Sequence, residues 1–81
     1  MEREITVLYF GAIRDASGIA EERLPTGAPT PRALYDEVCE LRGIGVPADE
    51  VVAVINDTYC MWNVSLNDGD KVVFVPRDAV E

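Results

Sequence analysis

Short apolar runs divide the chain and predict most of its strands. Nearly every residue is apolar in residues 4–10, 51–55 and 71–75, and such short runs are typical of β-strands. Residues 20–25 form a more polar run with three charged side chains, which favours a strand at the edge of a sheet. Residues 59–62 can turn back and pair with 51–55. We therefore expect five strands.

One main helix is expected over residues 31–42. Thr30 suits the N-cap, Pro31 suits the first helical position, and Gly43 follows the end. The apolar positions inside it recur at i, i+4 and i+7, which is the pattern of a helix with one buried stripe. These positions are Leu34, Val38 and Leu41. The stripe requires a partner surface.

The order of elements predicts how the helix and the strands pack. A short helix over residues 12–17, ended by Gly18, follows the first strand. The main helix lies between two groups of strands, so its single apolar stripe must cover one face of a mixed sheet. Both faces of 4–10 are apolar, which favours a central strand covered on both sides, and 71–75 should lie beside it. This is the outline of an α+β fold, the ubiquitin-like β-grasp.

Length and charge exclude several classes of protein. With 81 residues there is room for one domain, 1–81, whose last residues, 77–81, form a tail. The net charge of −8 disfavours nucleic acids and anionic membranes as partners and favours a basic partner. No apolar run approaches the roughly 20 residues of a membrane span. The N-terminus lacks the features of a secretory signal, so we expect a cytoplasmic protein.

Few residues in the chain can carry chemistry. The absence of histidine excludes Ser-His and Cys-His pairs, and two cysteines cannot form a zinc site or an iron–sulfur site unaided. We expect Cys39 to be buried beside the apolar stripe, and Cys60, which could be exposed, has no base nearby to activate it. The run 68–70 favours a turn over a calcium loop. We therefore expect no bound cofactor or metal, and no enzyme that acts alone.

Two blocks of the sequence carry recognisable motifs. Residues 7–18 read VLYFGAIRDASG: an apolar strand, an aromatic, a small residue, Arg-Asp and Gly. This block is similar to the opening of the MoaD family, the small subunits of molybdopterin synthase. Residues 52–56 read VAVIN and residues 66–76 read LNDGDKVVFVP, which is similar to the family's ending. The two blocks occur in the family's order and at its separation, so the resemblance spans nearly the whole chain.

The resemblance implies a sulfur carrier in molybdenum cofactor biosynthesis. Its partners would be a MoaE-like large subunit and an E1-like, MoeB-type activating enzyme, and the pathway product would be molybdopterin. The family ends in Gly-Gly, whose terminal carboxylate is adenylated and converted to a thiocarboxylate. Here Val80 and Glu81 stand at those positions. Val80 is stiff and Glu81 adds a second carboxylate, so we assign no catalytic residue and expect no thiocarboxylate on this chain.

The alternative function is a non-catalytic β-grasp module, interacting or regulatory, that keeps only a docking surface. Tyr59, Met61 and Trp62 either pack under the helix or form that surface on the helix-free face of the sheet, and both interpretations stay open. The expected partner contacts combine apolar and aromatic residues with two arginines and a proline. They are Phe10, Arg14, Tyr59, Met61, Trp62, Phe74, Pro76 and Arg77.

Overall fold

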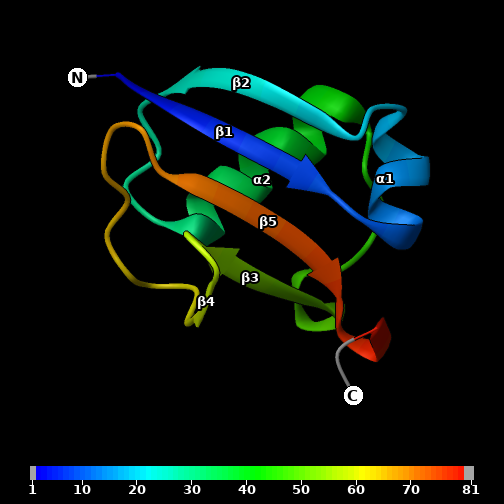
Figure 1. Cartoon of the computed structure of the whole chain (residues 1–81). Helices are drawn as coiled ribbons and strands as arrows, with labels where there is room; N and C mark the ends of the chain where they lie inside the picture. The colour runs from blue at the N-terminus through cyan, green and yellow to red at the C-terminus, as the bar shows by residue number, and fades with distance from the viewer. Residues whose placement is uncertain (1, 80–81) are drawn as a thin grey trace.

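The chain forms one mixed five-stranded sheet with a helix across one face (Figure 1). A computed structural model describes residues 2–79. The strands follow the order β2-β1-β5-β3-β4 across the sheet, and of these only β1 and β5 run parallel. The elements are β1 Arg3–Tyr9, α1 Gly11–Ser17, β2 Glu21–Thr26, α2 Pro31–Arg42, a 3₁₀ turn η1 Ala48–Glu50, β3 Val51–Ile55, β4 Thr58–Cys60, β5 Lys71–Pro76 and a 3₁₀ turn η2 Arg77–Ala79.

This architecture confirms the expected ubiquitin-like β-grasp. The two apolar strands β1 and β5 lie side by side within the sheet, and the polar strand β2 lies at its edge. β4 is shorter than the expected 59–62, because the chain leaves β3 after Cys60. The expected tail, 77–81, begins with the η2 turn. Val80 and Glu81 lie outside the described residues.

Helix α2 has the predicted bounds and caps. The Thr30 side chain accepts a hydrogen bond from the Ala33 N–H at 3.3 Å, and Gly43 ends the helix in the left-handed region with φ of 70°. The predicted stripe is wrong at one position, because the side chain of Leu41 is 56% exposed. Leu41 belongs to the last turn, which lies beside the edge strand β2, and the sheet extends no further beneath it.

The expectation that β1 is covered on both faces is wrong. Ile5, Val7 and Tyr9 are fully buried towards α2, but Thr6 and Leu8 on the opposite face are only half-buried. Figure 1 shows α2 behind the sheet, and no described element crosses the sheet on the viewer's side. The strand is apolar on both faces, yet the domain supplies a cover for only one. The second apolar face is therefore open to a partner.

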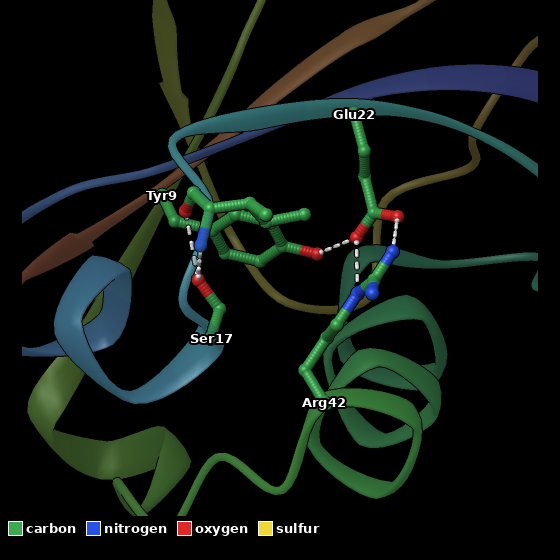
Figure 2. A network of polar contacts seen from close by, with 5 residues as sticks. Tyr9, Ser17, Glu22 and Arg42 are labelled. Carbon is green, nitrogen blue, oxygen red and sulfur yellow. Dashed lines mark hydrogen bonds and ion pairs between the residues drawn. The ribbon is translucent and has the colours of Figure 1, made fainter.

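A polar cluster ties the edge strand to the core and to α2 (Figure 2). The Tyr9 hydroxyl donates to Glu22 Oε2 at 2.6 Å, and Arg42 Nε donates to the same oxygen at 3.1 Å. A second Arg42 nitrogen contacts Glu22 Oε1. The pKa of Glu22 is lowered, chiefly by the hydrogen bond from Arg42. Burial raises the pKa of Tyr9. Glu22 is therefore held in its charged form.

We expect Glu22→Gln to lower the free energy of unfolding most at neutral pH. The pKa of Glu22 in the folded chain lies below its ordinary value of 4.5, so the unfolded chain takes up the proton first as pH falls. The charged Glu22 side chain therefore makes its full contribution to the free energy of unfolding above about pH 4.5. That contribution is lost as pH falls through the pKa of Glu22 in the folded chain. Urea unfolding of both proteins at a series of pH values measures the difference.

Glu21→Gln is the matched control, because it removes one charge from an exposed neighbour on the same strand. We expect a small effect from that control at neutral pH. A difference between wild type and Glu22→Gln that stays constant from neutral to acidic pH would contradict the role of the charged carboxylate.

Candidate functional site

The open face of the sheet carries a continuous row of apolar side chains. Strand register places Leu8 beside Val73, Val73 beside Val54, and Val54 beside Tyr59, so the row crosses four strands. These positions alternate with the buried ones that face α2, because successive side chains of a strand point to opposite faces. Tyr59 is exposed, Leu8 and Val54 are half-buried, and Val73 between them is 8% exposed. An apolar row that reaches the surface in this way is typical of a protein interface.

A second apolar row lies next to the first. Val52 and Val75 are register partners on β3 and β5, and both are half-buried. Phe10 follows β1 with extended backbone angles, φ of −125° and ψ of 156°, so its side chain points away from the buried Tyr9. We call the two rows together the docking face. Its members are Leu8, Phe10, Val52, Val54, Tyr59, Val73 and Val75.

Three of the four large apolar residues that are exposed among those described lie on or near the docking face, and the fourth, Leu41, lies on α2. Phe10 is 47% exposed and Tyr59 is 63% exposed. Met61, at 73%, follows β4 and lines an open groove of about 440 Å³ together with Val52 and Arg77. Aromatic side chains and methionine are enriched at protein interfaces, because they bury a large apolar area with adaptable contacts. Phe10, Tyr59 and Met61 are therefore accessible for the partner contact that the sequence predicts.

The end of the chain leaves the sheet at a fixed place beside α1. Gly11 has φ of +58°, and a Cβ there would lie 2.7 Å from Pro76 Cγ. Only glycine allows this close approach without strain. One residue later, Arg77 Nε donates to the Asp49 main-chain oxygen at 2.9 Å. The exit of the C-terminal segment is thus positioned by contacts to α1 and η1.

A hollow of about 290 Å³ lies beside this exit. Pro76 and Arg77 line it together with Ala12 from α1 and Glu50 from η1. Arg77 is exposed and Pro76 is half-buried, so both predicted contacts are accessible beside this exit. Arg14, also predicted from the opening motif, is exposed on α1.

Phe74 is not a surface residue, and the prediction that it contacts a partner is wrong. Its side chain is fully buried, and its ring lies 5.0 Å from Tyr35 and 6.4 Å from Tyr9 between ring centroids. Phe74 occupies a β5 position that faces α2, whereas Val73 and Val75 face the other way. The run 71–75 is apolar throughout, so its sequence does not distinguish the two faces.

Trp62 packs on the helix side of the sheet. Its ring stacks on Phe74 with centroids 6.1 Å apart and lies 5.6 Å from Tyr35. It is half-buried against the core and also lines the groove with Met61. Each of the two interpretations of residues 59–62 therefore holds for a different residue: Tyr59 faces outward from the sheet, and Trp62 packs under the helix.

The sequence prediction missed the valines and the leucine at the centre of the docking face. Leu8, Val52, Val54, Val73 and Val75 appear in the sequence only as parts of apolar runs. The signal that could identify them is alternation: once one member of each strand is assigned to the core, its neighbours must face the other side.

Polar chemistry is scarce near these surfaces. Cys39 is half-buried rather than buried, and burial raises the pKa of its thiol, which disfavours the reactive thiolate. The half-buried Cys60 thiol donates to the Thr58 main-chain oxygen at 3.2 Å. Within residues 2–79, no three acidic or cysteine side chains gather in a way that could hold a metal ion. None of the helices described for residues 2–79 is long and apolar enough to cross a membrane.

The fold and the open apolar face define a ubiquitin-like protein of the β-grasp class. The sequence profile of the ThiS family matches residues 7–77, and the chain belongs to this family. The match begins within β1 and ends just after β5, so it includes the last part of β1, the other four strands and both helices, α1 and α2. Comparison with functionally curated protein sequences gives no significant match.

Solved structures of three related kinds share this fold. A candidate molybdopterin converting factor subunit 1 from Pyrococcus furiosus is 26% identical, with 91% of this chain and 97% of that chain covered and a TM-score of 0.75. Small archaeal modifier protein 1 from Methanosarcina acetivorans is 16% identical, with 94% of each chain covered and a TM-score of 0.76. Urm1 from Trypanosoma brucei is 17% identical, with 93% and 92% covered and a TM-score of 0.69.

Proposed function

We propose that this chain is a MoaD-like small subunit of molybdopterin synthase that acts in the cytoplasm during molybdenum cofactor biosynthesis, with the fold of a sulfur carrier but with Val80 and Glu81 where the family has Gly-Gly. The observation that carries the proposal is the 26% identity to the candidate molybdopterin converting factor subunit 1 over 91% of this chain and 97% of that one. The proposed partners are an E1-like, MoeB-type activating enzyme and a MoaE-like large subunit. The chain itself would hold no cofactor and would be at most a non-catalytic carrier subunit rather than a complete enzyme.

The docking face supports a function that depends on partner proteins. It is apolar across four strands, and it adjoins the groove lined by Met61, Val52 and Arg77. Arg77 also belongs to the exit of the chain end. A partner that covers the docking face would therefore receive the C-terminal segment close to its own surface, which is the geometry that a carrier requires.

Sulfur transfer would take place on the terminal carboxylate. The activating enzyme would join that carboxylate to AMP from ATP and release pyrophosphate. A sulfur donor would then displace AMP and leave a thiocarboxylate, whose sulfur passes to the pterin precursor in the large subunit. This route needs an unhindered chain end, and residues 80 and 81 are valine and glutamate in this sequence. Both lie outside the described residues.

The test compares two forms of the protein with an E1-like enzyme, ATP and a sulfur donor. One form has the sequence as it stands, and the other carries Val80→Gly and Glu81→Gly. Intact mass spectrometry measures the exchange of one oxygen for sulfur. We expect the exchange in the Gly-Gly form and no exchange in the other. Glycine lets the chain end lie extended in a narrow channel of the enzyme, whereas a β-branched residue is stiff and an extra carboxylate is costly to bury there.

Binding to the large subunit, measured for both forms by titration calorimetry, separates the proposal from its alternative. We expect both forms to bind, since the docking face is the same in each. Binding without sulfur exchange in the Gly-Gly form would favour a non-catalytic interaction or regulatory module. A failure of both forms to bind either partner would contradict the proposal.

A further inference from the structure

The outer edge of β2 presents main-chain groups that the sheet does not use. In the described sheet β2 pairs with β1 only. On β1, the Thr6 N–H donates to the main-chain oxygen of Asp70, and the main-chain oxygen of Glu4 accepts from the Gly69 N–H in the loop before β5. Thr6 and Glu4 therefore direct these main-chain groups away from β2. Their register partners Arg23 and Pro25 therefore direct their own main-chain groups outward.

The same alternation applies to Glu21, the partner of Leu8. The open edge thus offers the N–H and C=O groups of Glu21 and Arg23 and the C=O group of Pro25. Outward-facing main-chain groups on every second residue can form hydrogen bonds with a further strand. Pro25 has no N–H, so the pairing would be concentrated on the first part of β2.

An exposed leucine lies on the flank of α2 next to this edge. Leu41 is 56% exposed and lines a hollow of about 420 Å³ together with Glu37 and Glu40. Leu41 and Glu37 are four residues apart and share one side of the helix. An apolar side chain between two carboxylates can hold an apolar group of a partner whose neighbouring groups are cationic.

Two polar contacts hold this flank of α2 against β2. Thr26 Oγ1 donates to Glu37 Oε1 at 2.7 Å, at the end of β2. Nearer the start of β2, Glu22 pairs with Arg42, the contact that Figure 2 shows. Leu41 lies between Glu37 and Arg42 in the sequence, on the stretch of α2 that these two contacts hold against β2. The Leu41 hollow is lined by α2 residues alone, so it lies on the helix that flanks the open edge.

The charge of this surface favours a basic occupant. Glu21, Glu37 and Glu40 contribute carboxylates, and the chain as a whole carries −8. Of the two nearby cations, Arg42 is already paired with Glu22. Arg23 lies 3.9 Å from Glu4 and is paired across the helix-free side of the sheet. A strand of like charge would be repelled, and a strand with lysine or arginine would be attracted.

We propose that the β2 edge and the Leu41 hollow bind an extended, basic segment of a partner protein by strand addition. Main-chain hydrogen bonds to Glu21 and Arg23 would hold the segment, and one of its apolar side chains would lie in the hollow. This surface is separate from the docking face, so the proposal does not depend on the function proposed above. The docking face lies on the helix-free face of the sheet, whereas the Leu41 hollow lies on α2 and the open edge lies on the outer side of β2.

The test uses a synthetic peptide of about ten residues in which lysine alternates with valine, long enough to span a typical strand. Titration into the ¹⁵N-labelled chain should shift the amide signals of Glu21, Arg23 and Leu41 and slow the hydrogen exchange of the first two. We expect Leu41→Ser to weaken binding about tenfold, because it removes the apolar anchor of a small interface. A peptide with glutamate in place of lysine should not bind.

Two N-methylated peptides test the strand addition without changing the protein. One is methylated on the residues that would face β2 and the other on the alternate residues. We expect the first to lose binding and the second to keep it, because only the first loses donors to the β2 edge. Equal binding of both, shifts confined to the docking face, no binding of the unmodified peptide, or pairing of β2 with a second copy of this chain would each overturn the proposal.

Discussion

Val54→Asp is expected to weaken binding to the proposed activating enzyme and to the proposed large subunit by about a hundredfold or more, because it would bury an unpaired carboxylate at an interface. Val54 lies at the middle of the docking face, between Val73 and Tyr59. Titration calorimetry measures the affinity, and urea unfolding establishes that the variant is folded.

Two further variants isolate the role of the docking face. Ala16→Asp adds the same charge to an exposed position of α1 and should leave binding nearly unchanged. Tyr59→Ala removes a side chain that is 63% exposed, so it should weaken binding by about tenfold with little effect on folding. If folded Val54→Asp and Tyr59→Ala proteins bind as wild type does, the docking face has been assigned to the wrong surface.

Phe74→Ala should lower the free energy of unfolding by about 3–5 kcal/mol, the range for removing a buried aromatic side chain. Phe74 is fully buried and contacts the rings of Tyr9, Tyr35 and Trp62. A domain of this length has a total stability of about 4–12 kcal/mol, so the variant is expected to be partly unfolded at the lower end of that range. Urea unfolding measures the change.

Tyr59→Ala is the control for that experiment as well, because it also removes an aromatic ring from a strand but from an exposed position. We expect it to change stability by less than about 1 kcal/mol. If Phe74→Ala were as stable as wild type and impaired only in binding, Phe74 would be a partner contact, as predicted from the sequence, and not a core residue.

Most of the fold could be predicted from local patterns. The bounds of α2 follow from Thr30, Pro31 and Gly43, which act through hydrogen bonds and backbone angles within a few residues. The edge position of β2 follows from its charged residues, which would be unfavourable in the middle of a sheet. In each case the interaction that decides the structure is close in sequence.

The site was harder to predict, because it depends on which face of each strand α2 covers. Phe74 and Val73 are adjacent, equally apolar and both buried, at 0% and 8% exposure, yet Phe74 faces α2 and Val73 faces the docking face. Trp62 and Tyr59 are close in sequence and are separated in the same way by the sheet. Leu41 follows the helical period and is exposed, because the sheet ends at β2.

The sequence by itself determined the elements, their order and the resemblance that led to the ThiS family. Capping, turn residues and apolar periodicity act locally and can be recognised in the chain. Only the tertiary structure decided which apolar side chains are buried, where Pro76 and Arg77 leave the sheet, and that Leu41 is exposed on α2. Those features depend on contacts between residues far apart in sequence, and a uniform apolar run does not contain that information.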